Sequence, residues 1–255
     1  MWLRLRQVCL VARELEPVVD QLEAVLGLAV AYRDPGVAHF GLENALLPVG
    51  NQLLEVVAPI QQHTAAGRYL DRRGGEGGYM VITQCDDHAP RRRRVAELGI
   101  RIAHQFEREG FQNLQLHPKD TGGSFFEIDC QTDGLEPDGP WAPAGPDWQA
   151  ARRTEVVRAI RAVEIQSPEP LRTAGRWSEI AEIPLERDGR GCVALPLENA
   201  SVRFVAPPDG RPEGLGGIDL EAVDRDRARA AAARRALRSK DGGIVICGTR
   251  FRLVT

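Results

Sequence analysis

One order of predicted elements, a strand, a helix and three short strands, occurs twice within residues 1–131. In the first copy, apolar spacing predicts a strand over 3–12 and a helix that ends at Gly27. Turn residues then separate three strands, at 28–33, 37–42 and 52–58. The second copy follows a glycine-rich hinge and comprises a strand at 79–85, a helix at 89–98 and strands near 100–104, 111–117 and 123–129. Each copy is therefore predicted to be one βαβββ module of an α+β protein.

The second half of the chain repeats this order after a segment of different composition. Residues 132–154 carry four prolines among Gly and Asp, which is typical of an extended linker. Beyond it we predict a strand at 156–166, a helix at 168–181, strands at 183–187, 192–196 and 200–206, a strand at 215–223, a helix at 224–238, and strands at 243–247 and 249–254. The sequence thus predicts four βαβββ modules paired into two tandem domains, 1–131 (modules 1–67 and 75–131) and 155–255.

An internal repeat supports this duplication. The string Leu-Glu-Asn-Ala occurs at 42–45 and again at 197–200, an offset of 155 residues. The string Val-Ala-Pro occurs at 57–59 and again at 205–207, an offset of 148 residues. An offset of 155 residues also aligns the opening strand of the first half with that of the second half. The opening strand and the two strings therefore occur in the same order in both halves.

Composition limits the classes of protein that the chain can belong to. Hydrophobic residues make up 43% and charged residues 27%, with a net charge of −3, which is typical of a soluble globular protein. No run approaches the roughly 20 apolar residues of a membrane span, and the N-terminus lacks an apolar signal segment, so we expect a cytoplasmic protein. Five separated cysteines without a C-x-x-C pair indicate reduced packing residues. The basic run 91–94 has no interleaved aromatic residues and is predicted to be a solvated helix face, so no nucleic-acid partner is expected.

Two segments of the first half resemble the vicinal oxygen chelate superfamily, which includes glyoxalases, bleomycin-resistance proteins and extradiol dioxygenases. The run at 69–78, Tyr-Leu-Asp-Arg-Arg-Gly-Gly-Glu-Gly-Gly, is similar to the junction between modules in methylmalonyl-CoA epimerases. The hairpin at 117–123, His-Pro-Lys-Asp-Thr-Gly-Gly, followed by Phe-Glu-Ile at 126–128, is similar to the last hairpin of that family. The resemblance covers residues 3–130, whereas the second half resembles the superfamily only in module order and in its repeat.

The resemblance implies that each pair of modules forms a cup, with a divalent metal ion held on facing strands. The four ligand positions fall here on Gln7, Glu55, Met80 and Glu127. Carboxylate oxygens suit such an ion, an amide oxygen is a weak ligand, and a thioether is a poor one. We therefore expect a degenerate metal site on Gln7, Glu55 and Glu127 that binds at most one divalent ion weakly, and no other cofactor.

Glu55 and Glu127 are also candidate catalytic residues on chemical grounds. Glu55 shares the face of its strand with Leu53 and Val57, and Glu127 is followed on its own face by Asp129. An ionised carboxylate on a largely apolar face must be paired, metal-bound or protonated with a raised pKa. If both carboxylates line one cup, their repulsion would raise one pKa and make the general base that an epimerase requires. The alternative for each is a salt-bridged structural residue at the sheet edge.

Three residues are expected to line the ligand pocket: Cys9, Met80 and His117. Met80 is interpreted as an apolar wall. For His117 two roles stay open, because it either orients a ligand or hydrogen-bonds the turn at Asp120.

The second domain carries no potential metal ligand at the matched positions, which are Ala162, Arg203, Gly217 and Arg252. This counts against an extradiol dioxygenase, since that relative holds its iron in the second domain. Two interpretations of the arginines stay open. The guanidinium groups either form an anion-binding pocket, or the cup is filled by side chains and the arginine stems reach solvent.

We interpret the chain as an enzyme of the epimerase or lyase kind that acts on a small oxygen-rich metabolite, with Glu55 and Glu127 as base or ligand and Gln7 assisting. The alternative is a non-catalytic small-molecule binding protein of the bleomycin-resistance kind, with an apolar cup around Met80 and Cys9. A third interpretation is an interaction scaffold in which both cups are collapsed. In each case we expect a monomer or homodimer that does not bind membranes, and fold resemblance alone does not select the substrate.

Overall fold

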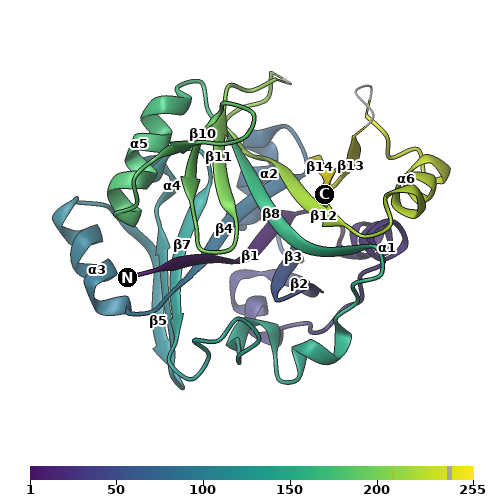
Figure 1. Cartoon of the computed structure of the whole chain (residues 1–255). Helices are drawn as coiled ribbons and strands as arrows, with labels where there is room; N and C mark the ends of the chain where they lie inside the picture. The colour runs from purple at the N-terminus through teal and green to yellow at the C-terminus, as the bar shows by residue number, and fades with distance from the viewer. Residues whose placement is uncertain (209, 240–242) are drawn as a thin grey trace.

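The computed structural model of the chain describes residues 1–208, 210–239 and 243–255, and its strands form two curled seven-stranded sheets (Figure 1). Sheet A has the strand order β2-β3-β1-β4-β7-β6-β5, and sheet B has the order β13-β14-β12-β8-β11-β10-β9. The strands of sheet A are β1 (Leu3–Val11), β2 (Leu42–Val49), β3 (Gln52–Pro59), β4 (Gly77–Cys85), β5 (Ile102–Arg108), β6 (Phe111–Leu116) and β7 (Phe125–Gln131). The strands of sheet B are β8 (Val157–Gln166), β9 (Glu186–Arg187), β10 (Val193–Pro196), β11 (Ser201–Val205), β12 (Gly214–Ala222), β13 (Ile244–Ile246) and β14 (Thr249–Val254). The helices are α1 (Leu15–Leu26), α2 (Ala65–Arg73), α3 (His88–Glu97), α4 (Pro118–Thr121), α5 (Pro170–Ala181) and α6 (Arg225–Arg234), with the 3₁₀ helices η1 (Pro35–Phe40), η2 (Ala142–Ala144) and η3 (Trp148–Ala151).

Each sheet consists of two βαβββ modules joined through their first strands. In sheet A these strands, β1 and β4, pair antiparallel, and in sheet B β8 and β12 do the same. Within each module the first strand lies parallel to the last one, as β1 does to β3 and β8 does to β11. The predicted α+β fold of four modules in two tandem domains is therefore confirmed.

The strand after the helix is reduced to a single bridge in the first and fourth modules. Tyr32 bridges Leu46, where the sequence predicts a full strand at 28–33, and Arg238 bridges Ile244 in the fourth module. These two modules keep the βαβββ order with a shortened second strand.

The predicted strand at 37–42 is wrong. The Asp34 carboxylate accepts a hydrogen bond from the backbone N–H of Gly36 and begins the 3₁₀ helix η1 in its place. The sequence pattern also does not predict β2, which contains Pro48. Because β2 is an edge strand of sheet A, the missing N–H of this proline is tolerated.

The two sheets pack against each other through one continuous hydrophobic core. Val8 of β1 and Val163 of β8 belong to it, and the ring of Phe126 on β7 stacks on that of Trp177 on helix α5 with centroids 4.3 Å apart. Figure 1 shows α1 beside α6, and residues of α3 and α5 are also in contact. Packed side chains therefore join the two sheets.

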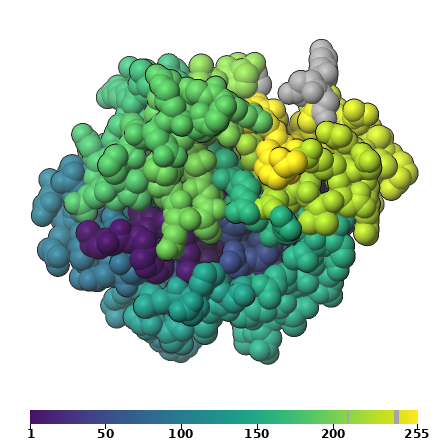
Figure 2. Space-filling model, viewed as in Figure 1, coloured from purple at the N-terminus to yellow at the C-terminus, as the bar shows by residue number. Residues whose placement is uncertain are grey.

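Residues 132–154, which we call the connecting segment, fold against sheet A and are not an extended linker. Trp141 and Trp148 are each 1% exposed. The guanidinium of Arg6 lies over both rings, 5.2 Å and 5.1 Å from their centroids, and donates to the carbonyl oxygen of Gly139 at 3.0 Å. Figure 2 shows the purple start of the chain between the teal connecting segment and green residues of the second half. Buried aromatic rings thus hold a segment whose proline content predicts a tether.

Only one of the two repeated strings occupies equivalent places in the two sheets. Val-Ala-Pro lies at the end of β3 at 57–59 and at the end of β11 at 205–207. Leu-Glu-Asn-Ala begins β2 at 42–45, but at 197–200 it forms the turn between β10 and β11. The match of the two Leu-Glu-Asn-Ala strings is therefore a coincidence of sequence. The duplication is supported by the sheet topology.

The basic run 91–94 on α3 is only partly a solvated helix face. Arg92 and Arg93 are exposed, whereas Arg91 is 1% exposed and donates to the carbonyl oxygen of Ala181 at 2.6 Å. Carbonyl groups at the C-terminal end of a helix, here α5, favour a cation. Arg91 therefore helps to join the two domains.

Candidate active site in the first cup

The concave face of sheet A and the connecting segment enclose a cavity of about 1570 Å³, which we call the first cup. Trp141 and Trp148 of the connecting segment line it. Six residues predicted from the sequence also line it: Gln7, Cys9, Glu55, Met80, His117 and Glu127. The register accounts for this convergence, because Cys9 on the central strand β1 pairs with Glu55 on one side and with Met80 on the other.

Glu55 is a buried carboxylate that neutral groups hold in place. Its Oε1 atom accepts from Asn44 Nδ2 at 2.7 Å, and its Oε2 atom accepts from Gln7 Nε2 at 2.9 Å. Burial raises the pKa of Glu55, and hydrogen bonds from Asn44, Cys9 and Gln7 oppose that rise. Burial also raises the pKa of Cys9 well above its usual range, so Cys9 remains a neutral thiol beside the carboxylate.

Glu127 forms a carboxyl pair with Asp129 on β7. Burial raises the pKa of Glu127 to about 7, with hydrogen bonds opposing and the charge of Glu55 adding to the rise. Burial, followed by the charge of Glu127, raises the pKa of Asp129 well above its usual range. Asp129 Oδ1 accepts from Asn113 Nδ2 at 3.1 Å, whereas its buried Oδ2 atom receives no hydrogen bond from any donor among the described residues. Protonation of Oδ2, which the raised pKa of Asp129 favours, would let this atom donate to the neighbouring Glu127.

Trp141 fixes the orientation of the Gln7 amide. Its Nε1–H donates to Gln7 Oε1 at 3.1 Å. Because an indole nitrogen is a donor only, the carbonyl oxygen of Gln7 must face it. The amide nitrogen of Gln7 is thereby turned towards Glu55.

These donors do not fit the divalent ion that the resemblance implies. Gln7 presents N–H groups to Glu55, and Met80 offers a thioether whose Sδ atom lies 3.2 Å from the amide nitrogen of Gln115. Two carboxylates, Glu55 and Glu127, are the oxygen donors that remain at the four positions. Within the described ranges, no three His, Cys, Asp or Glu residues are grouped so that they could hold a metal ion.

The remaining predicted pocket residue, His117, lies at the edge of the first cup. Its Nδ1 atom accepts from the backbone N–H of Lys119 at 3.2 Å and caps the short helix α4. This contact corresponds to the structural role that the sequence leaves open.

Aromatic rings form much of the wall of the first cup. The rings of Tyr79 and Phe125 meet edge to face with centroids 5.1 Å apart, and those of Phe111 and Trp141 do so at 5.2 Å. The cup therefore combines apolar walls with a small number of buried polar groups, which is the usual composition of a small-molecule site.

Sequence reasoning assigns no site role to four residues that complete the first cup: Asn44, Gln115, Asp129 and Trp141. Asp129 carries a usable signal, because it lies two residues after Glu127 and so on the same strand face. Asn44 lies on β2, which the pattern does not predict. Trp141 is 134 residues away from Gln7, and no local pattern links them.

Sheet B carries an arginine at the two register positions where sheet A has Glu55 and Glu127. Glu164 pairs with Arg203 just as Cys9 pairs with Glu55. The matched residues of the two sheets are Gln7 and Ala162, Cys9 and Glu164, Glu55 and Arg203, Met80 and Gly217, Ile82 and Asp219, and Glu127 and Arg252.

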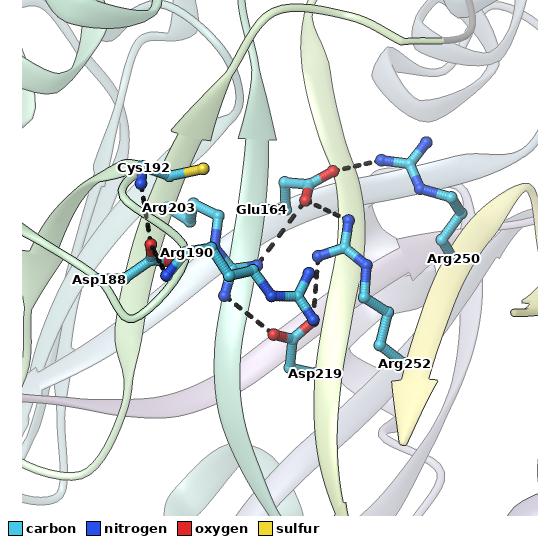
Figure 3. A network of polar contacts seen from close by, with 8 residues as sticks. All are labelled: Glu164, Asp188, Arg190, Cys192, Arg203, Asp219, Arg250 and Arg252. Atoms are coloured by element: carbon cyan, nitrogen blue, oxygen red, sulfur yellow. Dashed lines mark hydrogen bonds and ion pairs between the residues drawn. The ribbon is translucent and has the colours of Figure 1, made fainter. Parts of the chain in front are cut away.

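We call the corresponding face of sheet B, which carries Glu164, Arg203, Asp219 and Arg252, the second cup, and its arginines pair with carboxylates of the same cup (Figure 3). Arg203 donates to Asp219 at 2.9 Å, and Arg252 donates to Glu164 at 2.5 Å. One network contains the three arginines Arg203, Arg250 and Arg252 and the three carboxylates Glu164, Asp188 and Asp219.

Arg203 is the centre of this network. Burial alone would lower its pKa, but hydrogen bonds to Asp219 and Asp188 outweigh burial and raise it. Its side chain is 6% exposed, whereas that of Arg252 is 27% exposed. The arrangement favours the interpretation of a cup filled by its own side chains over an open anion-binding pocket.

Paired βαβββ modules that enclose a polar cup define the vicinal oxygen chelate class of proteins. The family model described as a glyoxalase-like domain matches residues 8–181, more than half of the chain. This chain therefore belongs to the glyoxalase-like domain family. Comparison with curated proteins gives no match. Among the helices of the described residues, none has the length and apolar content needed to cross a bilayer.

One solved structure shares the fold over the whole chain, and others are similar to about half of it. A hypothetical protein from Staphylococcus aureus is similar with a TM-score of 0.66 and 12% identity, covering 100% of this chain and 99% of that one. Methylmalonyl-CoA epimerase from Mycobacterium tuberculosis has a TM-score of 0.44 and 22% identity, covering 49% of this chain and 86% of that one. The Streptomyces coelicolor epimerase in complex with 2-nitronate-propionyl-CoA has a TM-score of 0.45 and 20% identity, covering 50% of this chain and 96% of that one.

Proposed function

We propose that the first cup catalyses proton transfer at a carbon next to a carbonyl group of a small oxygen-rich molecule, as epimerases and some lyases do. The observation that carries this proposal is that Glu127 and Asp129 lie side by side in the lining of the cavity, where burial raises the pKa of Glu127 to about 7 although its hydrogen bond with Asp129 opposes that rise. A general base works best when its pKa lies near the working pH. Glu127 accepts the proton from carbon, and Asp129 behind it hydrogen-bonds the carboxylate.

Amide groups supply the donors for the negative charge that such a reaction places on the substrate oxygen. The amide nitrogens of Gln7 and Asn44 each have one acceptor, Glu55, among the described residues. An amide nitrogen carries two N–H groups, so each has a second one to offer. Preorganised donors of this kind stabilise developing oxyanions in a water-excluded site. Glu55 holds both amides in place. In an epimerase the protonated form of Glu55, which burial favours by raising its pKa, would give its proton to the other face of the carbon and become ionised, while Glu127 keeps the proton that it removed.

Deuterium exchange tests this proposal without knowledge of the natural substrate. A panel of 2-oxo acids, 2-hydroxy ketones and acyl thioesters is incubated with the protein in D2O, and deuterium next to the carbonyl is followed by mass spectrometry. Removal of a general base costs about 100-fold or more in rate, so Glu127→Gln should lose the exchange. The rate catalysed by the parent should rise with pH through about 7.

The matched control is Glu43→Gln, on an exposed position of β2, which should keep the parent rate. Exchange that is as fast with Glu127→Gln as with the parent contradicts the proposed base.

A second candidate function, non-catalytic binding of a larger aromatic molecule, is favoured by the size of the first cup. Its volume of about 1570 Å³ exceeds the roughly 300–1,000 Å³ of common ligand sites, and its walls are rich in aromatic rings. A binder of this kind should retain aromatic compounds in native mass spectrometry, should quench Trp141 and Trp148 fluorescence, and should catalyse no deuterium exchange.

A further inference from the structure

The connecting segment supplies a side chain, Trp141, that acts together with Glu55 to fix the orientation of the Gln7 amide. Trp141 Nε1 donates to Gln7 Oε1 at 3.1 Å, and Gln7 Nε2 donates to Glu55 Oε2 at 2.9 Å. If the Gln7 amide were reversed, two donors would face each other at Trp141 and two acceptors would face each other at Glu55. The indole therefore selects the orientation in which Gln7 is a donor towards the cup.

Trp141 is itself held firmly. Its ring is 1% exposed, meets Phe111 edge to face with centroids 5.2 Å apart, and lies under the guanidinium of Arg6. Arg6 also donates to Gly139 at 3.0 Å, two residues before Trp141. The indole N–H thus reaches Gln7 from a backbone that β1 clamps.

Arg4, which also lies on β1, binds the connecting segment in the same way. Arg4 donates to the carbonyl oxygens of Gly134 and Glu136 at 3.1 Å and 2.8 Å. Two arginines of β1 therefore bind four carbonyl groups of the connecting segment, those of Gly134, Glu136, Pro137 and Gly139. The position of Trp141 is a property of the folded chain and not of a mobile loop.

We propose that Trp141 is a positioning residue that keeps a divalent cation out of the first cup by occupying the carbonyl oxygen of Gln7. The inference deepens the proposed function and rests on it for the role of Glu55 as a hydrogen-bonded carboxylate. Without the indole N–H, the Gln7 amide is free to turn its oxygen towards Glu55 and Glu127. Those three oxygen donors, together with an imidazole at position 80, would then form a site for a transition-metal ion.

Four proteins test this proposal: Met80→His alone, and Met80→His combined with Trp141→Phe, with Trp148→Phe or with Gln7→Ala. Trp148 is the matched control, because its ring is also 1% exposed and also lies against Arg6, but its Nε1 atom donates to Gly139 and not to Gln7. Each protein is titrated with Co²⁺ and followed by calorimetry and by the visible absorption of bound Co²⁺. Thermal unfolding of each variant checks that it is folded.

Groups that orient metal ligands typically change metal affinity by about 10- to 100-fold. The combination of Met80→His with Trp141→Phe should therefore bind Co²⁺ at least tenfold more tightly than Met80→His alone, and Trp148→Phe should give no such gain. Combination with Gln7→Ala should not reproduce the gain, since the oxygen donor is then missing.

The proposal is overturned if Trp141→Phe gives no tighter Co²⁺ binding, if Trp148→Phe gives an equal gain, or if no variant binds Co²⁺. Because the readout is metal affinity, these outcomes are separate from failure of the proposed function, which is the absence of Glu127-dependent deuterium exchange in the parent protein.

Discussion

The two cups of this chain have the same strand register and carry opposite charge at two of the matched positions. Glu55 and Glu127 of the first cup correspond to Arg203 and Arg252 of the second. The neutral neighbours in the first cup are replaced by acidic residues in the second, so that each arginine has a carboxylate within reach. Duplication has therefore kept the geometry while the polarity of the two sites has diverged.

The difference separates a cup suited to chemistry from one that serves structure. In the first cup, amides and a thiol are the partners of Glu55, and burial keeps the carboxyl pKa values high. In the second cup, hydrogen bonding to Arg203 lowers the pKa of Asp188 against the effect of burial. Carboxylates with strongly bound cations are poor bases, whereas carboxyl groups with raised pKa values exchange protons near neutral pH.

The largest expected effect is the loss of the central arginine of the second cup. Arg203→Ala leaves the buried Asp219 and the half-buried Asp188 without their principal cation, and removal of one partner from a buried ion pair costs about 3–5 kcal/mol. Urea unfolding followed by circular dichroism measures this loss. Arg92→Ala on the exposed side of α3 is the control and should stay within about 0.5 kcal/mol of the parent. A loss below about 1 kcal/mol for Arg203→Ala would mean that the network contributes little.

The next largest effect is a pH dependence of the unfolding free energy, which we expect because Glu127 in the first cup titrates near neutral pH. Its folded pKa, about 7, lies above the unfolded value of 4.5, so the folded state binds the proton more tightly. The stabilisation is fully present below about pH 4.5 and is lost as pH rises through about 7, by up to about 3 kcal/mol. Glu127→Gln should therefore flatten this part of the stability curve and be more stable than the parent at pH 8.

Chemical unfolding of the parent, Glu127→Gln and Glu43→Gln between pH 4 and pH 8 checks this prediction. The Glu43→Gln curve should run parallel to that of the parent. Parallel curves for Glu127→Gln and the parent would show that burial does not raise the pKa of Glu127.

A smaller effect distinguishes the two copies of the Leu-Glu-Asn-Ala string. The Asn199 side chain accepts from the backbone N–H of Leu5 at 2.8 Å and donates to its carbonyl oxygen at 3.0 Å. Asn199→Ala should cost about 1–2 kcal/mol at every pH, because it leaves backbone groups unpaired. Asn44→Ala removes a hydrogen bond that stabilises the ionised form of Glu55. The loss of unfolding free energy that it causes should therefore grow as pH rises. Equal pH dependence of the two variants in urea unfolding would contradict these separate roles.

Most of the fold could be predicted from sequence periodicity, because the apolar faces of helices and strands repeat at fixed spacing. The exceptions have local causes. The strand β2 contains Pro48, which reads as a turn residue, and Asp34 caps a 3₁₀ helix where the pattern indicates a strand. The strand β2 depends on its place at the edge of the sheet, and the 3₁₀ helix depends on the Asp34 cap. The spacing of apolar residues indicates neither feature.

The candidate site could be predicted only in part. Gln7, Glu55 and Glu127 could be placed in one cavity, because the resemblance to the vicinal oxygen chelate superfamily assigns them to the ligand positions of one cup. Their partners could not, since the contact of Trp141 with Gln7 spans 134 residues and joins a strand to a proline-rich segment. The charges of the second cup also become interpretable only when the register places Glu164 beside Arg203.

The smallest expected effect concerns Met80, which the second cup replaces by Gly217. The side chain of Met80 lines the first cup, and its Sδ atom is a weak acceptor for Gln115, which also donates to Glu127 at 3.0 Å. Met80→Leu keeps the volume of this wall, so stability should change by less than about 1 kcal/mol and the deuterium exchange rate should not change. Urea unfolding and the exchange assay measure both quantities. A large loss of exchange with normal stability would mean that the sulfur atom itself takes part in the site, and the first cup would then differ from the second in a ligand as well as in charge.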